Sequence, residues 1–193
     1  MSRILKNKKA LATVVTTLII LVVAVLLATV VTFYAVNITT NRMQQESLSM
    51  SNLHVWYNTT SPGWAEAAFS LINTGGKDVV LQSITTRSQP ANWSNVYYWT
   101  TDTATISNIY PTHIPLNRTA GSVMEDAPIN GTSTLQPLNP ASGVITLKAG
   151  WTLVVYVMHP GSIGQNDVGT PCDVTVFTAN AQWTQESNVQ ASQ

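Results

Sequence analysis

The sequence has little charge and almost no cysteine. Charged side chains make up 9% of its 193 residues, against roughly 25% in an ordinary soluble protein. The single cysteine, Cys172, excludes an internal disulfide framework. Four of the nine basic residues lie within the first nine positions, so the rest of the chain lacks the basic face that binds phosphates. We therefore expect no nucleic-acid partner.

The usual signatures of catalysis are also missing. There is no GxSxG nucleophile elbow and no glycine-rich phosphate loop. The only adjacent carboxylates, Glu125 and Asp126, fall in a predicted loop, and the other acidic residues lack EF-hand spacing. We therefore expect no catalytic residues, no cofactor and no enzymatic activity.

A blue-copper centre needs two histidines, one cysteine and usually a weak axial methionine. The residue types are present in Cys172, His54, His113, His159 and Met158. However, no histidine follows Cys172 within residues 173–193. The sequence therefore favours an inert, buried Cys172 and no metal site.

One long apolar run dominates the N-terminal part of the chain. The 26 residues of Leu11–Val36 carry no charge. As a helix at roughly 1.5 Å per residue the run would extend about 39 Å, enough to cross a bilayer core about 30 Å thick. The basic residues before it place the N-terminus in the cytoplasm and the rest of the chain outside.

The apolar run is longer than the core of a cleaved secretory signal, which has about 7–15 residues. An ordinary single-pass anchor that tethers an outer domain fits the composition and stays open as an alternative. A third interpretation comes from the residues just before the run, where Lys8-Lys9-Ala10 is followed at once by Leu11-Ala12-Thr13-Val14-Val15.

This arrangement resembles the type III, or prepilin-type, signal of archaeal type IV pilins and archaellins. The resemblance implies that a membrane peptidase cuts after Ala10, with Lys8 and Lys9 as the basic pair and Leu11 as the new N-terminus. Bacterial pilins have a Glu at the fifth mature position, where this chain has Val15, which matches the archaeal pattern. The glycine-rich start that is usual in archaellins is missing.

The resemblance implies a structural subunit of a surface filament, with adhesion favoured over motility. The expected partners are other copies of the chain in a helical homopolymer, the prepilin peptidase and assembly machinery, and membrane lipid before assembly. An open filament follows from a head-to-tail contact whose rotation does not close. The alternatives are an archaellin, and a membrane-anchored β-sandwich that binds a surface partner or glycan.

The resemblance implies a leader over residues 1–10, and together with the composition it predicts a membrane or filament-core helix with a stalk over 11–51 and an extracellular β-domain over 52–193. The segment after the apolar run lacks Pro and Gly up to Ser51. Its composition predicts that the helix continues from about residue 8 to 51.

From Leu53 onward the apolar pattern has a period of two, which indicates strands. Asn73–Gly76 predicts a hairpin turn between two of them, and Lys148–Gly150 a second tight turn. In the strand over 151–158, alternate residues from Trp151 to Val157 should share one face. We expect an α+β protein with an immunoglobulin-like sandwich after the helix. The expected strands are 53–57, 67–72, 79–86, 96–99, 144–147, 151–158 and 174–183.

Two groups of residues suggest carbohydrate. Sequons at Asn58, Asn92, Asn117 and Asn130 lie near predicted turns or loops and are candidate N-glycosylation sites, whereas the sequon at Asn37 falls in the helix. The aromatic cluster of residues 93–99 could stack on sugars, although strand core or subunit interface is favoured.

Overall fold

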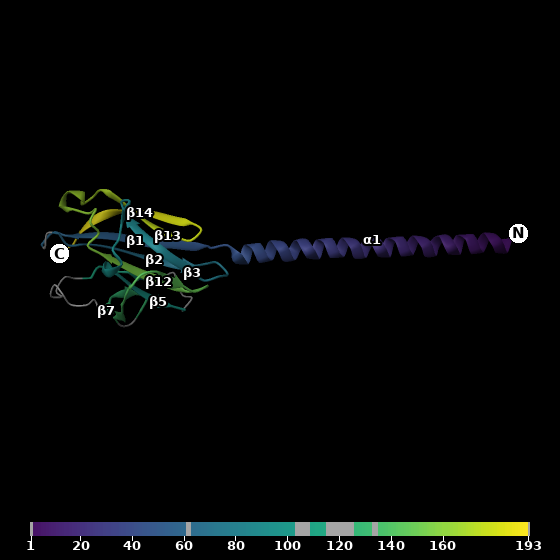
Figure 1. Ribbon diagram of the computed structural model, residues 1–193, viewed down its shortest axis with the longest axis horizontal. Coiled ribbons are helices and arrows are strands. Elements are labelled where there is room, and N and C mark those ends of the chain that lie inside the picture. The colour runs from purple at the N-terminus through teal and green to yellow at the C-terminus, as the bar shows by residue number, and fades with distance from the viewer. Residues whose placement is uncertain (1, 61–62, 103–108, 115–125, 133–134, 193) are drawn as a thin grey trace. The chain divides into compact units, whose positions relative to one another are not determined.

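The computed structural model describes residues 2–60, 63–102, 109–114, 126–132 and 135–192, with backbone alone for 2–9 and 126. The chain divides into two compact units, residues 1–44 and 45–193. The first is one long apolar helix and the second is mostly strand (Figure 1). The predicted α+β class is therefore confirmed.

Helix α1 spans Ser2–Gln44 and so contains the whole predicted apolar run. It ends before the predicted limit at Ser51, because strand β1 begins at Leu48. Leu48 is 6% exposed and packs in the core of the β unit. Burial of this side chain and the pairing of Leu48 with Asn73 therefore override the helix propensity of the local sequence.

Glu46 ties the first residues of the β unit to two of its turns. Its side chain is 7% exposed. Thr178 Oγ1 and Asn180 Nδ2 each donate a hydrogen bond of 2.6 Å to the carboxylate, and Lys77 Nζ lies 3.4 Å away. The hydrogen bond from Thr178 is the main cause that lowers the pKa of Glu46, while burial opposes it.

We expect acid to destabilise the β unit through Glu46. Because its pKa is lower in the folded chain, the stabilisation is complete above about 4.5, the ordinary value, and is lost as the pH falls through the folded-state pKa. All six tryptophans lie after residue 55, so their fluorescence during urea unfolding reports on this unit. Glu46→Gln should flatten the dependence of the urea midpoint on pH below about 4.5.

Glu186, which is exposed on strand β14, provides the matched control. Glu186→Gln should keep the wild-type pH dependence. Asp167 also has a lowered pKa, chiefly through a hydrogen bond from Arg87. Its contribution to the pH dependence of stability is present in both variants and does not affect their comparison. An E46Q chain as acid-sensitive as wild type would contradict the role of Glu46.

Among the described residues, ten strands form one sheet in the order β10-β5-β12-β2-β1-β14-β13-β3-β11, with β4 paired to β3. Pairing is antiparallel except between β1 and β14, which run parallel. The bounds are β1 Leu48–Asn58, β2 Ala65–Asn73, β3 Val79–Thr86, β4 Gln89–Pro90, β5 Val96–Thr101, β10 Asn139–Pro140, β11 Ile145–Leu147, β12 Thr152–Met158, β13 Pro171–Thr178 and β14 Gln182–Ser192.

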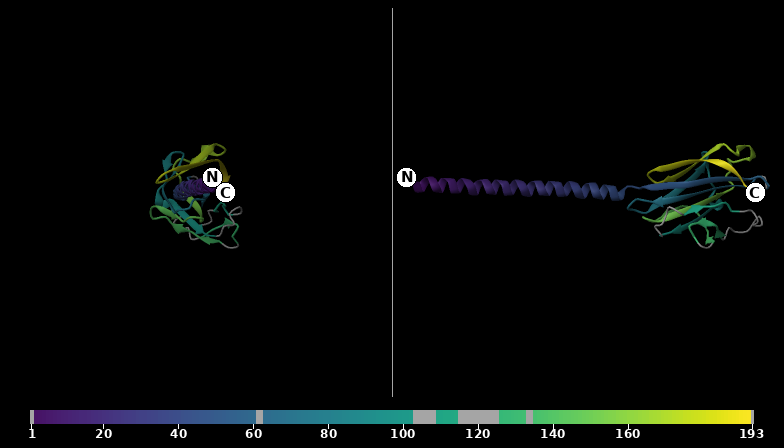
Figure 2. Two further views of the ribbon diagram at one scale, coloured as in Figure 1. Left: turned by 90° about the vertical axis from the view of Figure 1, so that its right-hand side faces the viewer. Right: turned by 180° about the vertical axis from the view of Figure 1, so that it is seen from behind.

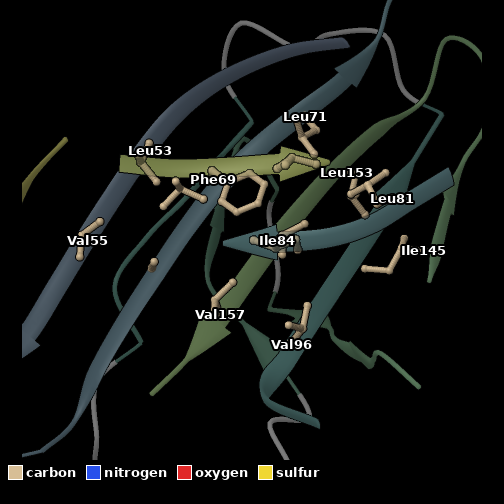
Figure 3. Close-up of a cluster of buried hydrophobic side chains, with 14 of the residues drawn as sticks. Leu53, Val55, Phe69, Leu71, Leu81, Ile84, Val96, Ile145, Leu153 and Val157 are labelled. Carbon is tan, nitrogen blue, oxygen red and sulfur yellow. The ribbon is translucent and has the colours of Figure 1, made fainter. Parts of the chain in front are cut away.

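The sheet curls so that its two halves enclose the main core. The half with β13 and β14, in yellow, lies opposite the half with β5 and β12 (Figures 1 and 2). Side chains from both halves meet between them, including Phe69 of β2, Leu81 of β3 and Leu153 of β12, each 0% exposed (Figure 3). Leu153, Val155 and Val157 all belong to this core, with Trp151 packed against it, which confirms the predicted face.

The predicted hairpin at Asn73–Gly76 is wrong. Strand β2 pairs with β1 and β12, whereas β3 pairs with β4, β11 and β13, so the turn crosses between the two halves of the sheet. The turn at Lys148–Gly150 crosses in the same way, from β11 to β12. The two crossings are bonded together: Asn73 Nδ2 donates to Leu147 O at 3.1 Å and Asn73 N to Trp151 O at 3.0 Å.

One further strand prediction is wrong. The single strand predicted over 174–183 is two strands, β13 and β14, which pair with each other around Asn180. The described part of the Thr- and Pro-rich stretch before β10 forms four more short strands, β6 Tyr110–Pro111, β7 Asp126–Ala127, β8 Ile129–Asn130 and β9 Gln136–Pro137. We refer to the described residues 109–114, 126–132 and 135–138 as the insertion.

The insertion covers the outer face of β2 and β12. Ile109, Ile114 and Ile129 of the insertion are buried against Tyr156 and Trp56 in a second apolar cluster. Strand β12 is consequently buried along its whole length, on both faces of the sheet.

Candidate functional site

Within its own unit, helix α1 presents a long run of exposed apolar side chains. From Leu11 to Ile38 its large apolar side chains are between 48% and 69% exposed. The stretch Ala10–Gln44 is long and apolar enough to cross a membrane. An apolar surface of this extent marks a membrane-contact or protein-contact surface.

Several polar side chains of the helix form hydrogen bonds to the helix's own backbone. Thr16, Thr29 and Thr32 each donate from Oγ1 to the carbonyl oxygen four residues before, at 2.8 Å. Asn37 Nδ2 donates to Phe33 O at 2.9 Å. A helix with satisfied hydroxyls tolerates lipid and also packs closely against other helices.

The proposed processing residues all lie in helix α1. The backbone of Lys8 and Lys9 is helical, and the Ala10–Leu11 bond continues the same helix. Leu11 is 67% exposed. Processing by a peptidase stays a prediction.

The four candidate glycosylation sites differ in exposure. Asn58 is only 2% exposed, and its Oδ1 accepts a hydrogen bond from Thr60 N at 2.8 Å. Asn92 and Asn130 are exposed, at the start of a short 3-10 helix and in β8. Asn117 lies outside the described residues.

In chain isolated from its native source, we expect glycans at Asn92 and Asn130 and none at Asn58. A transferase must reach the side-chain amide, and the amide of Asn58 is enclosed in the folded unit. Glycopeptide mass spectrometry measures occupancy at each site. A glycan at Asn58, or unmodified peptides at both Asn92 and Asn130, would contradict the expectation that exposure decides which sites are glycosylated.

A contact between a buried carboxyl group and a histidine joins the insertion to the sheet. Glu66 of β2 is 0% exposed, and His113 Nδ1 lies 2.6 Å from Glu66 Oε1. The same oxygen accepts a hydrogen bond from Ile114 N at 3.1 Å. Glu66 Oε2 has no hydrogen-bond partner among the residues that the structure describes.

Tyr156 makes a second polar link between the sheet and the insertion. Its hydroxyl donates to Thr112 O at 3.1 Å and accepts from Thr112 N at 3.2 Å. Burial is the main cause that raises the pKa of Tyr156. The hydroxyl therefore stays protonated, and the two polar links hold residues 112–114 against β2 and β12.

The three histidines do not converge on a metal. His54 stacks on Trp56, with 5.2 Å between the ring centroids. His113 also contacts Trp56, in a tilted arrangement with 5.5 Å between the centroids. His159 packs edge-on against Trp64. Within the described ranges, no group of three or more His, Cys, Asp or Glu is placed to hold a metal ion. Burial raises the pKa of the Cys172 thiol to about 11.

The aromatic cluster of residues 93–99 divides between the two cores. Trp93 and Tyr98 pack against the main core, while Tyr97 and Trp99 pack against the outer cluster. The sequence reasoning missed the pair Glu66–His113. Its one signal was a carboxylate inside the apolar segment Ala65–Phe69, because a buried carboxylate in a strand requires a partner.

No protein-family model matches this chain, and no curated protein matches its sequence. Among solved structures, the apo PCuAC domain of PmoF2 has a TM-score of 0.41 and 11% identity, over 76% of this chain and 95% of that one. The copper-bound PCuAC domain of PmoF2 has a TM-score of 0.33 and 10% identity, over 77% and 100%. Likenesses of this size carry no argument about function.

Proposed function

We propose that this chain is a structural subunit of an archaeal type IV pilus-like surface filament, with adhesion favoured over motility. The observation that carries the proposal is helix α1, whose uncharged apolar surface is exposed from Leu11 to Ile38. Lipid covers this surface in the membrane-bound precursor. In the filament, helices of neighbouring subunits replace the lipid.

Removal of the leader makes that exchange favourable. Residues 1–10 contain Arg3 and three lysines, and the remaining helix has no charge before Arg42. A charged side chain inside an apolar environment costs about 2.5–3.5 kcal/mol on insertion scales. A peptidase that cuts after Ala10 therefore removes the charges that would otherwise oppose entry into a helix bundle.

We further infer that the β unit is an immunoglobulin-like sandwich exposed on the outer surface of the filament. Two observations support this inference. An apolar core lies between the two halves of the sheet, and strand β1 pairs with β2 on one side and with β14 on the other. Such a unit gives each subunit a solvent-facing surface while the helices pack inside.

The test is electron microscopy of material sheared from cells, combined with N-terminal sequencing. We expect fibres that contain this chain and begin at Leu11. A chain that begins at Met1 and stays in the membrane fraction would overturn the proposal and favour the single-pass anchor. Deletion of the gene should abolish fibres and preserve swimming, whereas loss of swimming would indicate an archaellin.

A further inference from the structure

A small cavity opens between the β3–β4 hairpin and the loop after β12. Its volume is about 170 Å³, several times the roughly 30 Å³ that one water occupies in the liquid. One wall carries Thr86, Gln89, Asn92 and Asn95, and the facing wall follows His159 to Ser162. None of the residues that line this cavity belongs to helix α1 or to the Glu66–His113 pair.

The chemistry of the wall is polar and neutral. It offers amide, hydroxyl and imidazole groups, with Pro90, Pro160 and Met158 as apolar surfaces, and no Asp, Glu, Lys or Arg. Arg87, which follows the lining residue Thr86, pairs with Asp167 at 2.6 Å. A neutral ring with several hydroxyls and apolar C–H faces matches this lining better than a charged ligand does.

One polar group in the wall lacks a partner. Thr86 is 1% exposed, and its Oγ1 makes no hydrogen bond within the described part of the chain. A buried hydroxyl without a partner is unfavourable. Rotation about χ1 would bring this hydroxyl to a ligand in the cavity and supply the missing hydrogen bond.

Hydrogen bonds fix both walls of the cavity. Arg87 and Ser88 form the two-residue turn of the hairpin, with φ of 46° and 63°, as a type I′ turn requires, and His159 has φ of 48°. Arg87 Nη2 donates to Thr170 Oγ1 at 2.6 Å, and Ser162 Oγ donates to Thr86 O at 3.0 Å. Rigid walls reduce the entropy lost on binding.

We propose that this cavity is a seat for one neutral sugar residue. The sugar has two possible sources, a free saccharide of the surroundings or the first residue of a glycan on Asn92. Asn92 itself lines the cavity and is exposed, and its Oδ1 accepts a hydrogen bond from Ser94 N at 3.1 Å. A glycan on Asn92 requires the β unit to lie outside the cell, as the proposed function has it. Binding of a free saccharide does not depend on the proposed function.

For the attached source, the covalent step is a glycosyl transfer from a lipid-linked sugar phosphate. Nδ2 of Asn92 forms a bond to the anomeric carbon, and the bond from that carbon to the phosphate oxygen breaks. The lipid phosphate leaves with the electron pair, and one amide proton passes to a base of the transferase.

The first arm of the test uses the full-length chain from a host without N-glycosylation, in a detergent that has no sugar headgroup. Saturation-transfer NMR with glucose and N-acetylglucosamine should detect binding, and glucuronate should bind more weakly. Thr86→Val removes the hydroxyl without changing the shape and should weaken binding about five-fold. Gly161→Leu should block the cavity, because a Cβ at Gly161 already lies 3.4 Å from Gln89 Oε1. The control Thr146→Val changes an exposed threonine on β11 and should bind as wild type does.

The second arm uses chain from the native source. A glycan at Asn92 should slow hydrogen exchange in residues 86–95 and 159–162 relative to an Asn92→Gln chain. Thr86→Val should remove the difference, and the control Asn130→Gln should keep it. Binding in the first arm identifies a free saccharide, and protection in the second identifies the attached sugar.

A chain that shows neither effect has a cavity that holds only water, and the proposal is overturned. Neither arm depends on filaments. Fibres formed by a chain that fails both arms would therefore reject the sugar seat alone, and sugar binding by a chain that never forms fibres would reject the filament alone.

Discussion

A chain in which Lys8 and Lys9 are both replaced by Gln should remain at precursor mass and form no detectable fibres. The resemblance to prepilin signals assigns recognition by the peptidase to this basic pair. Without cleavage the leader stays attached, and Arg3 and Lys6 would have to enter the apolar interior of the filament, at about 2.5–3.5 kcal/mol each. Intact mass and electron microscopy of sheared material measure the two effects.

The matched control is Lys6→Gln, which removes one leader charge and keeps the basic pair. This variant should be cleaved and should assemble as wild type does. If K8Q/K9Q chain is still cut before Leu11, or if uncut chain forms fibres, leader removal does not control assembly.

The second large effect is expected from His113→Ala, which should destabilise the β unit by about 3–5 kcal/mol. Among the described residues, the substitution leaves the Glu66 carboxylate, which is 0% exposed in the wild-type chain, with the hydrogen bond from Ile114 N but without its contact to His113. An uncompensated buried charge is more costly than a missing contact. The urea midpoint, followed by tryptophan fluorescence, measures the change.

Combining Glu66→Gln with His113→Ala should recover much of the lost stability, because the double variant no longer buries an unpaired charge. His54→Ala serves as control: it removes the stacking on Trp56 and should cost no more than about 1.5 kcal/mol. A double variant as unstable as H113A alone would show that the loss comes from packing and not from the charge of Glu66.

The long helix was predictable because a charge-free run of this length has few alternatives. Its end was not, because Met43–Glu46 have good helix propensity and only tertiary contacts of Glu46 and Leu48 stop the helix. The strands over 79–86 and 151–158 followed from period-two patterns, as did the core face of the second.

Strand pairing was not predictable from the turns. Asn73–Gly76 and Lys148–Gly150 show where the chain changes direction but not which strand it then joins. The same limit applies to the buried pair, because Glu66 and His113 are far apart in sequence and meet only when the insertion folds onto β2. The cavity likewise needs the hairpin at Arg87 and the loop after β12 to be brought together.

The parallel contact of β1 with β14 has a mechanical consequence. Val55 is in register with Val189 and Asn58 with Ser192, so tension applied between the start of β1 and the end of β14 pulls the two strands past each other along their length. The hydrogen bonds between them then share the load and must fail together, which requires more force than peeling them one at a time. Forced opening is governed by the unfolding rate, so this pair of strands should slow the opening of the β unit under a pull in that direction.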